Sequence, residues 1–249
     1  MCWQVSSPQE YEQGRRELVA HTARSGSRLL IVGATAGGAG NAGAVSAPDP
    51  SHSVSSGEQP LAVLRALRDE VHAAWRSGQS LRVLARMEYL ASPQASLQEL
   101  VMHEMELGEL AARGGTSVVC AYSQLVWDKH VIRDLAAVHS RVMGLRPPTT
   151  GFRLARVDAD SWSLDGSVGF ESLRAFSAAL GGALARTPRA RLRCAHLDLI
   201  DASGLAALVE IVRQTPGGSV LLEQVNETVS AAWRMSGYAA LGAAIEVQP

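Results

Sequence analysis

Residues 197–208 read LDLIDASGLAAL, an aliphatic strand that passes into a helix through the polar link Asp201-Ala-Ser-Gly204. We expect the strand to cover Leu192–Leu199 and the helix to cover Ser203–Arg213, because apolar residues change from a continuous run to helical spacing at the link. A strand that leads directly into a helix is typical of an α/β fold with a mostly parallel sheet.

The flanking sequence completes a domain of this class between residues 152 and 249. The other expected elements, in chain order, are two strands within Phe152–Val168, a helix over Glu171–Arg186, a strand at Ser219–Val225, a helix at Glu227–Ser236 and a strand at Ala244–Val247. The order β-β-α-β-α-β-α-β predicts a compact α/β domain of about 100 residues.

The first half of the chain, residues 1–143, predicts helices and strands in alternation, and hence a second parallel sheet. Ser7 and Pro8 are typical of a helix start, and Gly26 of its end. The further elements are strands at Leu29–Val32, Leu81–Ala85 and Ser117–Tyr122, and helices from Pro60 to Gly78, with a buried stripe from Leu61 to Trp75, and over Leu97–Arg113.

Two stretches interrupt this pattern. Residues 33–57 are almost entirely Gly, Ala, Ser and Pro, which predicts a flexible segment inside the first domain. Residues 144–151 contain a double proline and a closing glycine, which predicts a stiff linker. The expected organisation is therefore a domain at 1–143, a linker at 144–151 and a domain at 152–249.

Charge and composition exclude several classes of partner. The 249 residues carry a net charge of −1, with 13 basic and 14 acidic residues in 1–143 and 9 and 10 in 152–249, so neither half predicts nucleic-acid binding. No stretch is long and apolar enough for a membrane span. Three scattered cysteines favour a reducing, cytoplasmic compartment. Arg189, Arg191 and Arg193 alternate on what we interpret as a solvated strand edge.

Motifs for catalysis are also missing from the sequence. The Gly-rich run after residue 33 lacks the lysine of a phosphate-binding loop, and the only lysine is Lys129. His103, Glu104, Glu106, His130 and His139 have no spacing that fixes a metal. We therefore expect no enzyme, no cofactor, no catalytic residue and no metal site.

The link between strand and helix is the one group of residues in the sequence that suggests a functional site. Asp201 or Ser203 can cap the exposed N–H groups of the helix, and Gly204 allows a close approach of the chain. A hydroxyl at a helix N-terminus is also a position where a phosphate is favoured. The residues alone leave both interpretations open, a structural cap or a phosphorylation and partner-binding site.

The same stretch resembles the core motif of STAS domains, the fold of bacterial anti-sigma-factor antagonists. The resemblance covers about residues 152–249 and includes Ser219–Val225 with Trp233 and Gly237. It implies that Ser203 is the serine phosphorylated by a partner kinase, with Asp201 and Gly204 beside it. It departs from the usual pattern at Ala202, where a serine is common.

The first half resembles the MEDS domain, a sensory module distantly related to RecA-like ATPases. The matching residues are Cys2-Trp3, Glu10-Tyr-Glu12, Leu81–Glu88, Glu104 with Glu106, Val119–Tyr122 and His139. The resemblance implies a RecA-like parallel sheet and a small-molecule ligand. Because Glu88 ends one predicted strand and Cys120 and Tyr122 lie on another, we predict that these three residues line a pocket at the strand ends. Ser123 stands where the family usually has Asp.

Two classes of function follow. The first is a non-enzymatic regulator of transcription, in which a sensory domain is coupled to a switch that binds an anti-sigma factor or a serine kinase. The alternative is a small-molecule or redox sensor, for example through Cys120, whose STAS-like half is only a docking module. Phosphorylation of Ser203 would favour the first, and a ligand bound to residues 1–143 the second.

Overall fold

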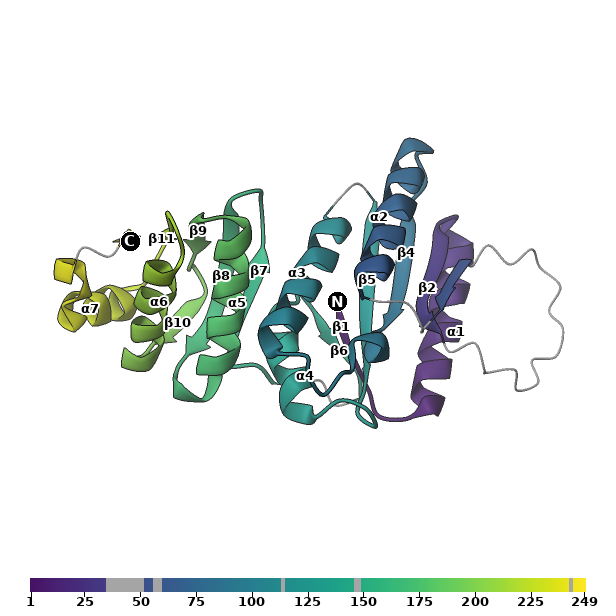
Figure 1. The fold of residues 1–249 in the computed structure, drawn as a ribbon, viewed down its shortest axis with the longest axis horizontal. Helices are drawn as coiled ribbons and strands as arrows, with labels where there is room; N and C mark the ends of the chain where they lie inside the picture. The colour runs from purple at the N-terminus through teal and green to yellow at the C-terminus, as the bar shows by residue number, and fades with distance from the viewer. Residues whose placement is uncertain (35–51, 56–59, 113–114, 146–148, 242–243) are drawn as a thin grey trace, which may run out of the picture. The chain divides into compact units, whose positions relative to one another are not determined.

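The computed structural model contains two β-sheets, each within its own compact unit (Figure 1). It describes residues 1–34, 52–55, 60–112, 115–145, 149–241 and 244–249. The first unit comprises Met1–Ala95, Glu106–Lys129 and Val142–Pro147, and the second comprises Ser96–Met105, His130–Arg141 and Pro148–Pro249. The predicted α/β fold class is confirmed, because both units combine helices with sheets of mostly parallel strands. The predicted domain boundaries stay a prediction.

Sheet A, in the first unit, has the strand order β3-β2-β4-β5-β1-β6, and all of its neighbouring strands are parallel. Its strands are β1 (Cys2–Val5), β2 (Arg28–Ala34), β3 (His52–Ser55), β4 (Leu81–Arg86), β5 (Thr116–Ser123) and β6 (Val142–Met143). The parallel arrangement agrees with the alternation of helices and strands in the sequence.

Of the helices between these strands, the three that were predicted follow their expected bounds closely. The helices are α1 (Pro8–Ser25), α2 (Pro60–Arg76), the short 3₁₀ helix η1 (Met87–Leu90), α3 (Leu97–Ala111) and α4 (Lys129–Ala136). The Ser7 side chain accepts the N–H of Glu10 at the start of α1, and Gly26 ends the helix in the left-handed conformation. Two residues of the predicted stripe on α2 were wrongly assigned, because Leu61 and Trp75 are exposed.

Among the described residues of the first half, five elements were not predicted: β1, β3, η1, α4 and β6. Most of the predicted flexible segment, residues 35–51 and 56–57, lies outside the described residues. His52–Ser55 differs from that prediction, since it forms β3 and pairs in parallel with β2. Strand pairing is made by backbone hydrogen bonds, which this composition does not reveal.

Sheet B, in the second unit, has the order β10-β8-β9-β11-β12, and β7 pairs with β8 antiparallel. Its strands are β7 (Phe152–Arg156), β8 (Ser161–Val168), β9 (Arg189–Arg193), β10 (Leu197–Ile200), β11 (Ser219–Glu223) and β12 (Ile245–Val247). The helices are η2 (Phe170–Ser172), α5 (Leu173–Arg186), α6 (Ala202–Gln214), α7 (Glu227–Ser236) and η3 (Tyr238–Leu241). Phe152 of β7 packs edge to face on Phe176 of α5 within the buried core.

The predicted strand Leu192–Leu199 was wrong in one respect, because the chain forms two strands there. β9 pairs with Ser161–Ser163 of β8, and β10 pairs with the later part of the same strand, Gly166–Val168. The residues between them, around Cys194, leave the ladder, and the N–H of Leu197 bonds the carbonyl of Cys194. An apolar run does not reveal such a break, because the side chains on both sides of it are buried.

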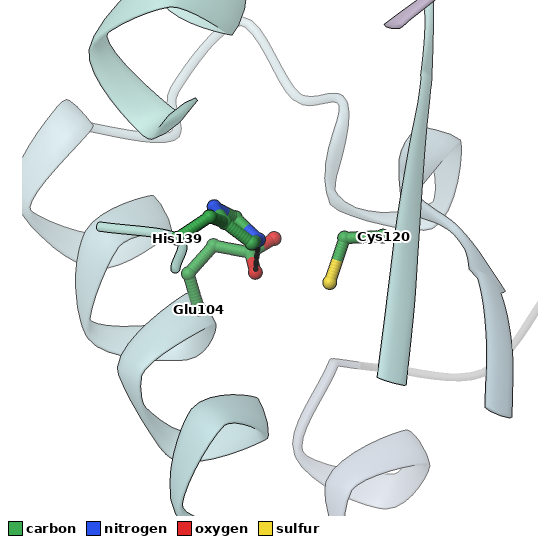
Figure 2. A group of neighbouring side chains, drawn as sticks. All are labelled: Glu104, Cys120 and His139. Carbon is green, nitrogen blue, oxygen red and sulfur yellow. Dashed lines mark ion pairs between the residues drawn. The ribbon is translucent and has the colours of Figure 1, made fainter. Parts of the chain in front are cut away.

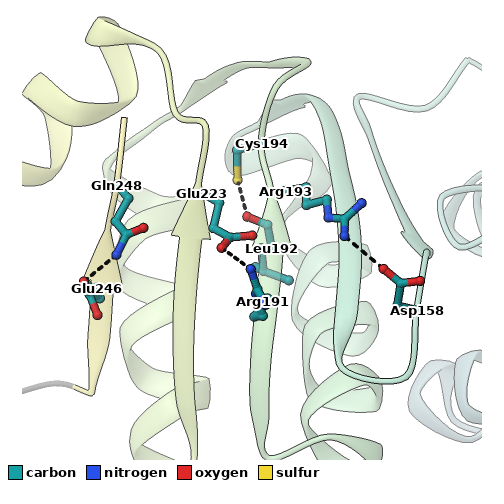
Figure 3. A network of polar contacts seen from close by, with 8 residues as sticks. All are labelled: Asp158, Arg191, Leu192, Arg193, Cys194, Glu223, Glu246 and Gln248. Atoms are coloured by element: carbon teal, nitrogen blue, oxygen red, sulfur yellow. Dashed lines mark hydrogen bonds and ion pairs between the residues drawn. The ribbon is translucent and has the colours of Figure 1, made fainter.

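The interpretation of the three alternating arginines as a strand edge was also wrong. β9 lies between β8 and β11, and its residues alternate between exposed arginines and buried Ala190 and Leu192. Arg191 and Arg193 stand on the face of sheet B away from the helices (Figure 3), and Arg189, two residues before Arg191, is exposed as well. On that face Arg191 pairs with Glu223 at 2.6 Å and Arg193 with Asp158 at 2.9 Å.

Among the described residues, no helix has the length and apolar character needed to cross a membrane.

Candidate functional site

The link between β10 and α6 forms a tightly connected turn. Asp201 is the N-cap residue of α6, and its carboxylate Oδ1 accepts the N–H of Gly204 at 2.9 Å. The backbone N–H of Asp201 donates to the carbonyl of Val168 at 2.9 Å, which ties the turn to β8. A Cβ at position 204 would lie 2.8 Å from side-chain carbons of Ile200 and Val168, so this close packing requires glycine.

The Ser203 hydroxyl lies in the first turn of α6. It is half-buried, and it donates a hydrogen bond of 2.6 Å to Oδ1 of Asp201. Ala202, where the family motif often has a second serine, is exposed. Of the two candidate caps, the structure therefore assigns the cap to Asp201, and Ser203 supports that carboxylate.

The other carboxylate oxygen of Asp201 reaches a different element. Its Oδ2 accepts the N–H of Phe170 in η2 at 3.1 Å. Gly169 makes this approach possible, because a Cβ there would lie 2.8 Å from the same oxygen. The hydrogen bonds from Ser203, and then those from Gly204 and Phe170, hold the pKa of Asp201 below its ordinary value.

A cavity of about 560 Å³ adjoins this turn. Asp201, Phe170 and Ser172 contribute to one part of its wall, and Arg133 and Asp134 to another. Phe170 is 79% exposed, although its backbone is held by Asp201. Sequence reasoning did not find Phe170, since nothing near it in the sequence indicates a contact with a residue 31 positions away.

The buried carboxylate of Asp134, which lines this cavity, forms an ion pair with the largely exposed Arg174. The Asp134 side chain is only 4% exposed and accepts a hydrogen bond of 3.1 Å from Nε of Arg174 in α5. A second guanidinium, that of Arg133, lies 3.5 Å from the other oxygen of Asp134. Breaking such a pair by removing one partner leaves a buried charge, so we expect Arg174 to fix this wall of the cavity.

The three residues of the predicted ligand pocket lie on two elements of the first unit, β5 and the 3₁₀ helix η1 that follows β4. Cys120 and Tyr122 are both buried and face the same side of β5, because they are two residues apart. Glu88 lies in η1, with its carboxylate 3.5 Å from Nε of Arg86. Arg86 pairs with Ala121 and therefore faces the opposite side of the sheet from Cys120. A pocket shared by the three would have to span the strand ends, and it stays a prediction.

The Arg86 side of sheet A carries an aromatic cluster. The rings of Trp3 and Tyr11 stack with centroids 5.7 Å apart, and the Arg86 guanidinium lies 4.9 Å from the Tyr11 centroid. Gly14 of α1 leaves space for Trp3, because a Cβ there would lie 2.4 Å from the indole. Burial raises the pKa of Tyr11 to about 12. These residues belong to the quoted family motif, but their mutual contacts were not predicted.

Two further residues of the family motif form a buried ion pair in the second unit. Nε2 of His139 lies 3.0 Å from Oε2 of Glu104 in α3, and both side chains are buried (Figure 2). The other ring nitrogen of His139, Nδ1, contacts the carbonyl of Leu135 at 2.9 Å. Both nitrogens of the imidazole are therefore in hydrogen-bonding contact, which fixes the orientation of the ring.

The family model of MEDS, the methanogen/methylotroph DcmR sensory domain, matches residues 1–140 of the chain. The chain belongs to the MEDS family. A search among curated proteins finds no match. Among solved structures, the chain is similar to the anti-sigma factor antagonist SpoIIAA in its unphosphorylated form, with 14% identity and a TM-score of 0.28, over 38% of this chain and 86% of that one. The likeness of residues 152–249 to STAS domains rests on their motif and order of elements.

Proposed function

We propose that this chain is a non-enzymatic signalling regulator, in which the MEDS domain senses a small molecule and the part after residue 151 acts as a phosphorylation-controlled switch. The switch residue is Ser203, which a partner serine kinase phosphorylates. The unmodified form binds a protein partner of the anti-sigma-factor type and thereby affects transcription. The observation that carries the proposal is the half-buried Ser203 hydroxyl at the start of α6, hydrogen-bonded to Asp201.

The position of Ser203 favours a phosphoryl group in electrostatic terms. A phosphoserine carries a charge of about −1.5 to −2, and the N-terminal end of a helix stabilises such a charge. The helix can therefore accept the modification without unfolding. Neighbouring Asp201 opposes it, because its low pKa keeps this carboxylate ionised at neutral pH.

Modification would also change the contacts of Asp201. The Ser203 hydroxyl loses its proton when the ester forms, so it can no longer donate to Oδ1 of Asp201. Repulsion between the phosphoryl group and the carboxylate replaces the bond of 2.6 Å. Because the same carboxylate holds the N–H of Phe170, we expect phosphorylation to loosen η2 at the edge of the cavity.

Partner binding should therefore respond in two ways to the modification. The added charge repels acidic groups of an approaching partner, and the backbone of Phe170, which carries an exposed ring, loses its bond to Asp201. Both effects weaken the complex while the domain stays folded. The motif shared with anti-sigma-factor antagonists supports this direction of the switch.

The test compares variants of Ser203 in binding to the partner, which is first isolated with the intact chain from its native host and identified by mass. We expect Ser203→Asp to bind the partner at least about tenfold more weakly than the wild type does. Ser203→Ala should bind the partner constitutively, even in the presence of the kinase. Both variants should melt within a few degrees of the wild type. If both bind the partner as the wild type does, Ser203 serves only the helix start.

Ser7 offers a matched control for the added charge. It begins α1 as Asp201 begins α6, is half-buried, and lies in the first unit. Aspartate is as good an N-cap as serine, so Ser7→Asp adds one negative charge with little structural cost. We expect this variant to bind the partner normally, and a loss of binding would show that net charge rather than the Ser203 site controls the complex.

A further inference from the structure

Two buried cysteines lie side by side in the centre of sheet A. Cys2 of β1 and Cys120 of β5 are register partners in the parallel ladder, and the N–H of Cys120 donates to the carbonyl of Met1 at 2.8 Å. They are 0% and 2% exposed. Both belong to the first unit. The sequence places them 118 positions apart, so only the fold brings them together.

Their side chains point to the same face of the sheet. Register partners on neighbouring strands share a face, and the next pair along, Trp3 and Ala121, belongs to one hydrophobic cluster with Leu84. Cys2 and Cys120 each precede a member of that pair, so both point to the other face. The opposite neighbour of Cys120 on that face is Ala85 of β4, which has a small side chain.

The spacing of neighbouring strands suits a disulfide. Adjacent strands lie about 4.8 Å apart, which falls within the range of about 4.4–6.8 Å between the Cα atoms of disulfide-bonded cysteines. The Cβ atoms need a small additional approach, since their preferred separation in a disulfide is about 3.8 Å. We infer that Cys2 and Cys120 form a reversible redox pair, a modification site that crosslinks β1 to β5 in the MEDS domain.

The chemistry requires an oxidant of the disulfide or peroxide class. With a small disulfide, one cysteine thiolate attacks a sulfur of the oxidant and releases one thiolate, giving a mixed disulfide. The second cysteine then attacks the cysteine sulfur of that intermediate and releases the other thiolate. The two protons of the cysteines end on the two released thiols, so the oxidant is reduced by two electrons.

Access to these thiols requires a local opening of β1. The outer neighbour of β1 is β6, which contributes only two residues, Val142 and Met143, to the ladder. Few backbone bonds therefore hold that side of β1, and elements of this kind open more readily than the rest of a sheet. In a reducing compartment the dithiol form prevails, and the crosslink forms on oxidative stress, as is usual for redox-sensing cysteines. The inference does not depend on a switch at Ser203.

The test oxidises the full chain with oxidised glutathione, a small disulfide, blocks the remaining thiols and maps tryptic peptides by mass. We expect a peptide that joins residues 1–15 to residues 114–129, lighter by two hydrogens (about 2 Da) than the sum of both and cleaved by dithiothreitol. The oxidised chain should also melt at a higher temperature, because the crosslink closes a loop of roughly 120 residues.

Cys194 provides the matched control. It is equally buried, lies in the second unit and bonds the carbonyl of Leu192, and burial raises the pKa of its thiol to about 12. Cys194→Ser should retain the crosslink, whereas Cys2→Ser and Cys120→Ser should each lose it. In the chain unfolded in urea, the preference for the Cys2–Cys120 crosslink should disappear.

Three results would overturn the inference. In the first, the folded wild-type chain forms no crosslink. In the second, Cys2 or Cys120 is oxidised without the other, and in the third, the crosslink includes Cys194. Because the mapping is made on the wild type, a variant that fails to fold does not affect the outcome.

Discussion

The two sheets of this protein consist largely of parallel strands, but they use their faces differently. In β4 of sheet A the successive residues Val83, Leu84 and Ala85 are all fully buried. In β9 of sheet B, exposed arginines alternate with buried Ala190 and Leu192. Strand β4 is therefore covered on both sides, whereas β9 has one side open to solvent.

Because of this difference, we expect sheet A to contribute more to stability and sheet B to present the more accessible surface. Side chains of sheet A form a closely packed core, in which a change of side-chain volume lowers the stability of the fold. Side chains on the open face of sheet B form a network of exposed ion pairs, which contributes little to stability and stays available for contacts (Figure 3). Four predictions test this contrast.

The largest expected effect concerns equal substitutions on the two sheets. Leu84→Ala removes a fully buried side chain of β4 and should lower the free energy of unfolding by about 3 kcal/mol. Leu221→Ala, on the half-buried face of β11, should lower it by less than about 1 kcal/mol. Urea denaturation measures both. Similar losses for the two variants would show that sheet B is covered on both faces in solution.

Next in size is the loss of the helix cap at the candidate site. Asp201→Ala removes the bond to Gly204 and should cost about 1 kcal/mol at neutral pH. The folded state lowers the pKa of Asp201, so its stabilisation is present above the ordinary aspartate pKa of about 4 and is lost as the pH falls through the lower folded value.

Denaturation as a function of pH measures this dependence. The difference between wild type and Asp201→Asn should therefore shrink below about pH 4. Ser7→Ala, which removes the cap of α1 in the first unit, provides a control whose cost should not vary over this range, because serine does not titrate there. A difference for Asp201→Asn that is independent of pH would contradict the assigned ionised cap.

A smaller effect is expected on the open face of sheet B. The Arg191–Glu223 pair is 2.6 Å long, but the Arg191 side chain is half exposed. A double-mutant cycle with Arg191→Ala and Glu223→Ala should give only a small coupling free energy, which decreases with added salt. A large coupling that does not respond to salt would mean that this face is covered by another surface.

The smallest effect at neutral pH is expected for Tyr11. Burial raises its pKa in the folded state to about 12, above the ordinary value of 10.0, so its stabilising contribution is complete below pH 10 and is lost as the pH rises towards 12. Tyr11→Phe keeps the stacking on Trp3 and should leave stability at pH 7 nearly unchanged. Absorbance titration should lose one late-ionising tyrosine in this variant, and an unchanged titration curve would refute the assignment.

Local sequence signals determined much of the secondary structure. The bounds of α1 follow from Ser7, Pro8 and Gly26, and α7 begins and ends at the predicted residues. The turn at Asp201 could also be predicted from the sequence, because its cap involves residues only three positions apart. Such interactions are complete within one turn of helix, so they leave a pattern in the sequence itself.

The tertiary structure decided everything that depends on strand neighbours. The place of β9 inside sheet B, the break before β10 and the register of Cys2 with Cys120 come from strand order, which no local pattern specifies. The bond from Phe170 to Asp201 likewise joins two elements that follow different strands. The sequence by itself thus determined the α/β class, the MEDS resemblance and the polar turn at Asp201. Only packing of whole sheet faces decided which distant residues lie together, because a strand's register is fixed by the side chains it buries.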